Sequence, residues 1–198
     1  MKWLYIFTLS YLGLGGLYFL QDFNFEFIIY VAVIVIIFVG VIATLPHTRF
    51  PLWMLWLLSI WGLMHVLGGA IQTPDGVLFA YRIYPFLDGA GDMYILKYDQ
   101  VVHSYLYGLV SVMTYFLFKS ICNVTSHRTF AVLVAILVSV GISALNEIME
   151  FLIAISLERN GVGGYENAML DFVFNLGGAV IGVLIYKFYE SRKTLQVK

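Results

Sequence analysis

Eight polar side chains interrupt the apolar stretches of this sequence. They are His65, Asp99, His103, Asn146, Glu147, Glu150, Asp171 and Asn175. Three pairs in this set are three or four positions apart, which places both members on one face of an α-helix: Asp99 with His103, Glu147 with Glu150, and Asp171 with Asn175. Imidazoles and carboxylates bind divalent cations, and a carboxylate can also act as a general base. The set therefore predicts metal or proton chemistry.

The metal chemistry predicted for this set is that of a divalent ion, Zn, Mn or Mg, with an open position for a water molecule that the metal makes more acidic. The candidate ligands are His65, Asp99, His103, Glu147, Glu150 and Asp171. Glu147 or Glu150 can instead be the catalytic general base, and Asn146 and Asn175 complete the polar site. The sequence has no His-Glu-x-x-His zinc motif. The prediction therefore rests on the residue types and on their common depth in the membrane, which the expected helices define below.

Each of these residues, taken alone, also has a structural explanation. Asp99 can cap the helix that begins near it, Asp171 can interact with the dipole at a helix start, and His65 can be a hydrogen-bonded packing histidine. Taken together, four carboxylates and two histidines at one depth need protons, a cation or basic groups to neutralise them. The basic side chains available in the neighbouring loops are Arg82, Lys97 and Arg159.

The composition indicates a membrane protein. Of the 198 residues, 61% are hydrophobic and only 12% are charged, whereas about a quarter of the residues in a soluble domain are charged. A net charge of -1 without a basic arm excludes nucleic acid as a partner, because binding it needs a clustered positive surface. No polar linker divides the chain, so we expect a single transmembrane domain over residues 1–198.

Six stretches have the roughly 20 apolar residues that a helix needs to cross the hydrocarbon. They cover residues 3–20, 27–45, 51–71, 100–121, 129–156 and 168–189. The predicted fold is therefore an all-α polytopic membrane bundle of about six transmembrane helices. The long connection over 72–98 mixes apolar and tyrosine residues, and we expect it to form a lid or re-entrant hairpin over one face.

Basic residues predict the orientation of the bundle, because cytoplasmic loops hold more Lys and Arg. Eight of the 11 basic residues fall on the side of the termini and three on the other side, so both termini are predicted to be cytoplasmic. The polar residues of the last four helices then lie together in the outer leaflet. We expect a multi-pass protein of the cell (plasma or inner) membrane.

Three strings carry a family resemblance. They are Tyr-Asp-Gln-Val-Val-His at 98–103, Asn-Glu-Ile-Met-Glu at 146–150, and Asp171-x-x-x-Asn175-x-x-Gly178. In this order they resemble the YjdF-like family of uncharacterised inner-membrane proteins, and more loosely the VanZ-like family. The resemblance implies the same helical fold and the same choice of polar residues. Ala70 stands where the YjdF-like pattern has a second histidine after His65, which argues against a metal site built on both histidines of that element.

Three functions are compatible with such a site. The first is a membrane-embedded, metal-dependent hydrolase or transferase that acts on a lipid or lipid-linked substrate from the outer leaflet. The second is a proton- or cation-coupled transporter that loads its carboxylates, although transporter sites commonly lie at the midplane. The third is a non-catalytic membrane scaffold. The sequence leaves enzymatic activity and oligomeric state open.

Overall fold

The computed structural model describes residues 1–74, 76–89, 93–121, 128–158 and 161–195. Six long helices form the body of the molecule, and all six are long and apolar enough to cross a membrane. They are α1 (Lys2–Gln21), α2 (Phe25–Thr48), α3 (Leu52–Ala70), α4 (Tyr98–Ser120), α5 (Arg128–Ser156) and α6 (Tyr165–Leu195). The predicted all-α membrane bundle is thus confirmed, with α6 beginning earlier and ending later than the hydropathy indicated.

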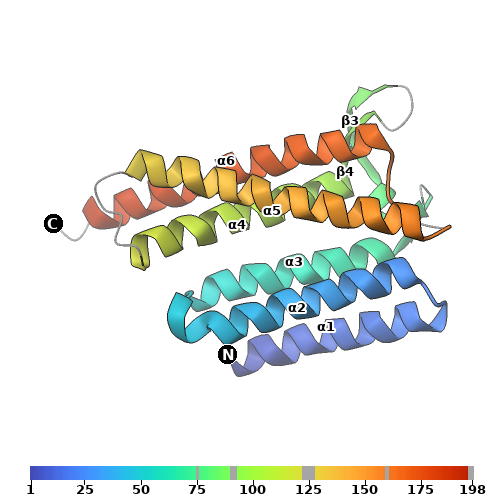
Figure 1. Cartoon of the computed structure of the whole chain (residues 1–198), viewed down its shortest axis with the longest axis horizontal. Coiled ribbons are helices and arrows are strands. Elements are labelled where there is room, and N and C mark those ends of the chain that lie inside the picture. Colours follow the sequence, from blue (N-terminus) through green and yellow to red (C-terminus); the bar gives the residue numbers. More distant parts are fainter. Residues whose placement is uncertain (75, 90–92, 122–127, 159–160, 196–198) are drawn as a thin grey trace.

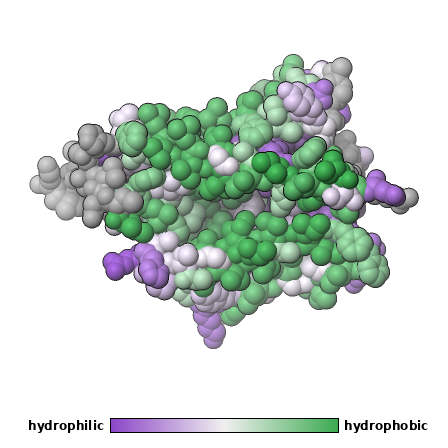
Figure 2. Space-filling model, in the orientation of Figure 1, coloured by the Kyte–Doolittle hydropathy of each residue, from purple (hydrophilic) through white to green (hydrophobic). Residues whose placement is uncertain are grey.

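The helices form two groups, with α1, α2 and α3 on one side and α4, α5 and α6 on the other (Figure 1). Successive helices run in opposite directions, so both chain ends lie at one end of the bundle and the strands lie at the opposite end. We call the latter the hairpin end. Hydrophobic residues dominate the long sides of the molecule in Figure 2, as expected for surfaces that face lipid.

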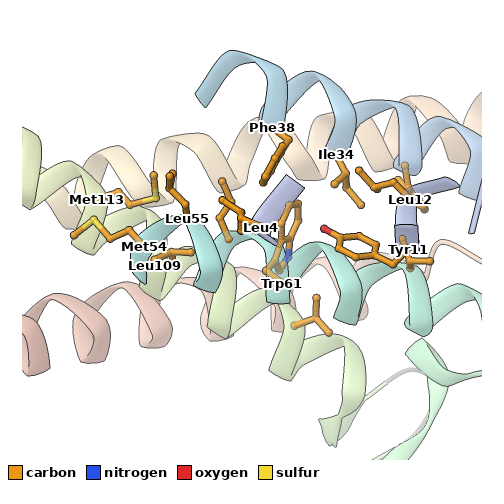
Figure 3. Packing of buried hydrophobic residues seen from close by; sticks show 14 of the residues in the cluster. Leu4, Tyr11, Leu12, Ile34, Phe38, Met54, Leu55, Trp61, Leu109 and Met113 are labelled. Carbon is orange, nitrogen blue, oxygen red and sulfur yellow. The ribbon is translucent and has the colours of Figure 1, made fainter. Parts of the chain in front are cut away.

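The first group of helices packs around an apolar core to which α4 also contributes. Figure 3 shows Leu4, Tyr11 and Trp61 from α1 and α3 beside Ile34 and Phe38 of α2. A buried hydrogen bond of 2.6 Å between the hydroxyl groups of Thr8 and Ser59 joins α1 to α3. This core holds α3 in place against α1 and α2.

The second group depends on a close contact between α4 and α6. A Cβ atom added to Gly178 would collide with the backbone of Ser104, and one added to Gly182 would collide with the backbone of Gly108. The Ser111 hydroxyl donates to the carbonyl oxygen of Ala179 across the same contact, at 2.8 Å. The small-residue face of α6 therefore packs inside the bundle, against α4, as small-xxx-small patterns permit.

The connection predicted as a lid forms two short antiparallel hairpins around a 3-10 turn. These are β1 (Gln72–Thr73) with β2 (Gly76–Val77), and β3 (Arg82–Asp88) with β4 (Tyr94–Lys97), separated by η1 (Leu78–Ala80). Strand β3 is exposed along its whole length, so it does not cover the helices. The part around Phe79, whose ring contacts the rings of His65 and Phe27, lies over the bundle, and Tyr94 of β4 is buried against it.

Gln100 fixes the junction between β4 and α4. Its side-chain oxygen accepts from the Lys97 amide at 3.0 Å, and its Nε2 donates to the Tyr94 carbonyl oxygen at 2.8 Å. Gln100 is fully buried, so the first turn of α4 is held firmly against the strand. These two hydrogen bonds, rather than a cap by Asp99, fix the start of α4.

Candidate functional site

Helices α4, α5 and α6 bring a buried imidazole and four carboxylates together at the hairpin end. His103 on α4 lies at the centre, and its side chain is 6% exposed. Asp99 lies one turn before it on α4, Glu147 and Glu150 come from α5, and Asp171 comes from α6. Residues that are far apart in the sequence thus meet around one ring.

Both ring nitrogens of His103 face carboxylate oxygens. Nε2 is 3.5 Å from Asp99 Oδ1 and 3.8 Å from Glu150 Oε1, and Nδ1 is 3.7 Å from Glu147 Oε1. These separations exceed the usual hydrogen-bond length. They approach the roughly 3.4 Å that separates two ligand atoms bound tetrahedrally at about 2.1 Å from one metal ion.

The amide side chains orient the acidic ones. Asn146 donates to Glu150 Oε1 at 2.7 Å, and Asn175 Oδ1 lies 3.2 Å from His103 Nδ1. Asn167 donates to Asp171 Oδ2 at 2.7 Å. Each of these contacts holds one side of a carboxylate or imidazole and leaves another side free for a further partner, the arrangement common around metal ligands.

Two carboxylate oxygens in the cluster are buried without a hydrogen bond from any described residue, namely Glu147 Oε1 and Asp171 Oδ1. Asp171 is fully buried. A buried polar atom normally has a partner because its desolvation costs about 1 to 3 kcal/mol, and more if it is charged. The two oxygens therefore identify a place where a cation, a proton or a water molecule belongs.

Two overlapping groups have the donor atoms for a metal ion. In the described residues they are Asp99–His103–Asp171 and His103–Glu147–Glu150, with the ligand atoms of each group within 4.8 Å of one another. Imidazole with carboxylates suits Zn²⁺ or Mn²⁺, and carboxylates alone suit Mg²⁺. Five of the six predicted metal ligands thus lie in a single cluster.

His65, the sixth predicted ligand, belongs to neither group within the described part of the chain. Its ring lies among those of Tyr30, Trp61 and Phe79. It nevertheless lines a small cavity of about 50 Å³ together with Asp99, His103 and Glu150. His65 is therefore a neighbour of the cluster, held in an aromatic surround.

Two residues of the site, Asn167 and Glu26, were not predicted from the sequence, and Lys97 was predicted only as a basic group that could fold in from a loop. The Lys97 ammonium group donates a hydrogen bond to Asn167 Oδ1 at 2.8 Å. Because Asn167 in turn donates to Asp171, the three side chains form a chain of hydrogen bonds. Glu26, at the start of α2, is 7% exposed, lines the small cavity, and accepts from the Gly161 amide at 2.7 Å. The four-residue spacing of Asn167 and Asp171 could have predicted the contact between these two side chains. No local sequence pattern links Glu26 to Gly161.

The other two basic candidates, Arg82 and Arg159, differ in what the structure describes of them. The Arg82 guanidinium lies over the Tyr94 ring, 4.9 Å from its centroid, and Arg159 lies outside the described residues. Lys97 is connected to the cluster through the amide of Asn167. The ion pairs recorded for the cluster carboxylates Asp99, Glu147 and Glu150 are those with His103.

These features define a polytopic helical membrane protein with an acidic, histidine-centred site inside the bundle. The chain belongs to the family described as "Predicted membrane protein (DUF2238)", which matches residues 3–192. The YjdF-like resemblance is to this family and is confirmed, while the looser similarity to the VanZ-like family stays a prediction. Neither the curated proteins nor the solved structures contain a match to the chain.

Proposed function

We propose that this protein is a membrane-embedded, metal-dependent hydrolase or transferase that acts on a lipid or lipid-linked substrate. The observation that carries the proposal is the buried Asp171 Oδ1, which accepts no hydrogen bond from a described residue and belongs to a group with His103 and Asp99. A divalent cation there would satisfy that oxygen and offset the charge of the cluster. Asp99, His103 and Asp171 are the proposed ligands.

Glu147 and Glu150 are the proposed general bases. Both line a cavity between α5 and α6, whereas Asp99 and Asp171 do not contribute to its lining. A water molecule bound to the metal would be more acidic than bulk water, and a carboxylate beside it could accept its proton. In this proposal, α4 and α6 supply the metal ligands and α5 supplies the general base.

Transport receives less support from the arrangement of polar groups. The buried carboxylates of the described residues, Glu26, Glu147 and Asp171, are on helix segments at the hairpin end. Toward the termini, α4 and α6 are in backbone contact at Gly108 and Gly182, and Ser139 donates its hydroxyl to the Tyr107 carbonyl oxygen. A cation path would need further polar groups along this seam.

Calorimetric titration of the purified protein with Mn²⁺ and Zn²⁺ tests the proposal. Wild type is expected to bind one equivalent of one of these ions, and Asp171→Asn should weaken binding at least tenfold. Asp88→Asn, on exposed β3, is the matched control and should bind as wild type does. Equal binding by Asp171→Asn and wild type would overturn the assignment of Asp171 as a ligand.

A second variant separates ligands from the base. Glu150→Gln should retain metal binding but lose turnover of a vesicle-borne lipid phosphate by 10²-fold or more, since a positioned general base contributes about 10² to 10⁴. Loss of metal binding in Glu150→Gln would instead make Glu150 a ligand. Unchanged turnover would remove it from the reaction.

A further inference from the structure

The cavity between α5 and α6 has two kinds of wall. Its volume is about 380 Å³, within the range of small-molecule sites, roughly 300 to 1,000 Å³. Polar side chains at one wall belong to the candidate site, and apolar ones come from the facing ends of the two helices. The first set is Glu147, Glu150 and Asn167, and the second includes Phe151, Ala154 and Ala168.

The apolar wall reaches the surface that the bundle presents to lipid. Phe151 is 61% exposed, and Tyr165, which also lines the cavity, is 75% exposed. Both belong to helices that are apolar enough to span a membrane. A molecule lying in the bilayer could therefore place its chain against Phe151 and its polar head against Glu150, without passing through water.

We propose that this α5–α6 cavity binds a phosphate-bearing membrane amphiphile, which enters sideways from the bilayer with its head toward Glu150. The identity of the head rests on the proposed metal, because carboxylates alone repel phosphate. Glu147 and Glu150 connect the two sites, since they line the cavity and their oxygens lie within 4.8 Å of a ring nitrogen of His103, a proposed metal ligand. A divalent ion held by one or two carboxylates commonly completes its shell with phosphate oxygens of the substrate. The apolar wall favours a ligand that carries a hydrocarbon chain over inorganic phosphate, which has none.

Two other cavities fit this role less well. One, of about 560 Å³ between α3, α4 and α6, has no charged side chain in its lining. Another, of about 230 Å³ between α2 and α5, reaches Asn146 and His65 but none of the carboxylates. Each provides a control position, Ile181 in the first and Leu145 in the second.

Photolabelling tests this assignment. The full chain would be placed in phosphatidylcholine nanodiscs with phosphatidic acid carrying a diazirine in its acyl chain, with added Mn²⁺, and labelled peptides would be mapped by mass spectrometry. We expect labels at the end of α5 and the start of α6. Ala168→Trp and Ala154→Trp should each lower them about tenfold, while Leu145→Trp and Ile181→Trp leave them unchanged.

A loss of labelling in Ala168→Trp is counted only if that variant keeps the melting temperature and metal affinity of wild type. Ala168→Leu, a smaller change in the same wall, should give an intermediate loss. Labelling that survives both Ala168→Trp and Ala154→Trp overturns the proposal, as does a loss caused by Leu145→Trp or Ile181→Trp. Inorganic phosphate that competes as well as unlabelled phosphatidic acid would also overturn it.

Metal removal distinguishes this inference from the proposed function. If chelation abolishes labelling and Mn²⁺ restores it, both stand. If labelling is sensitive to Ala168→Trp but indifferent to chelation, the cavity binds the amphiphile, and the inference that the metal holds its head falls. If the protein binds metal but labelling at α5 and α6 is absent, the cavity assignment falls and the metal centre stands.

Discussion

At the scale of single residues, His103 is the group on which the cluster depends. It is the only residue common to both metal-capable groups of the described chain. Its ring nitrogens lie 3.5 to 3.8 Å from carboxylate oxygens of both α4 and α5. Without it, several buried carboxylates would face one another with less to offset their charge.

His103→Ala should therefore destabilise the protein strongly. Removing one partner from a buried charged pair typically costs about 3 to 5 kcal/mol, and we expect a loss of that size in the free energy of unfolding, measured by denaturant titration in detergent. His47→Ala, at an exposed position near the end of α2, should change stability little. Equal stability of the two variants would contradict a central role for His103.

Asn167 acts as a positioning residue for Asp171. Its amide accepts from Lys97 and donates to Asp171, which fixes the direction of the carboxylate. Partners of metal ligands typically contribute 10- to 100-fold in affinity, so Asn167→Leu should weaken metal binding by that factor in calorimetry. Glu166→Gln, one position earlier and exposed, is the control; an equal affinity in both variants would rule out this role.

At the scale of elements, the α4–α6 contact sets the distance between His103 and Asp171. It depends on Gly178, where a Cβ atom would meet the Ser104 carbonyl oxygen. The neighbouring Gly177 has nothing within 4 Å of such an atom. The two adjacent glycines thus offer the same substitution with opposite consequences.

Gly177→Ala should stabilise the protein by about 0.5 to 1 kcal/mol, because alanine is the better helix residue. Gly178→Ala should lower stability and weaken metal binding, because it forces the two backbones apart. Melting temperatures and calorimetry of the two variants give the comparison. If Gly178→Ala matched Gly177→Ala in both measurements, the close contact would not control the site.

The sequence predicts the helices well because an apolar stretch of about 20 residues has few alternatives in lipid. It also predicts the faces of the pairs on α4, α5 and α6, since those follow from helical spacing alone. It does not predict the hairpins over 72–97, because apolar residues occur on both faces of β3 and the pairing with β4 depends on distant neighbours. Glu26 was missed for the same reason, because its partner Gly161 lies 135 positions away.

At the scale of the whole molecule, the bundle has a chemically distinct end. The candidate site lies at the hairpin end, and both termini lie at the other. The excess of Lys and Arg on the terminal side predicts that the site opens toward the outer leaflet. That orientation decides which leaflet supplies the proposed substrate.

Cysteine labelling tests the orientation. In a Cys122→Ser background, Asp88→Cys should react with a membrane-impermeant maleimide added to intact cells, and Arg192→Cys should react only after the membrane is opened. The physical reason is that exposed β3 and the end of α6 lie on opposite sides of the spans. Reaction of Arg192→Cys in intact cells would place the site in the inner leaflet.

The most direct test of the metal centre is anomalous diffraction from crystals grown with Mn²⁺ or Zn²⁺. The proposed arrangement predicts a peak within ligand distance, about 2.0 to 2.2 Å, of His103 and of the Asp171 oxygen that has no hydrogen bond from a described residue, and no such peak in Asp171→Asn. An empty site at saturating metal, or a peak only at positions remote from His103, would contradict it.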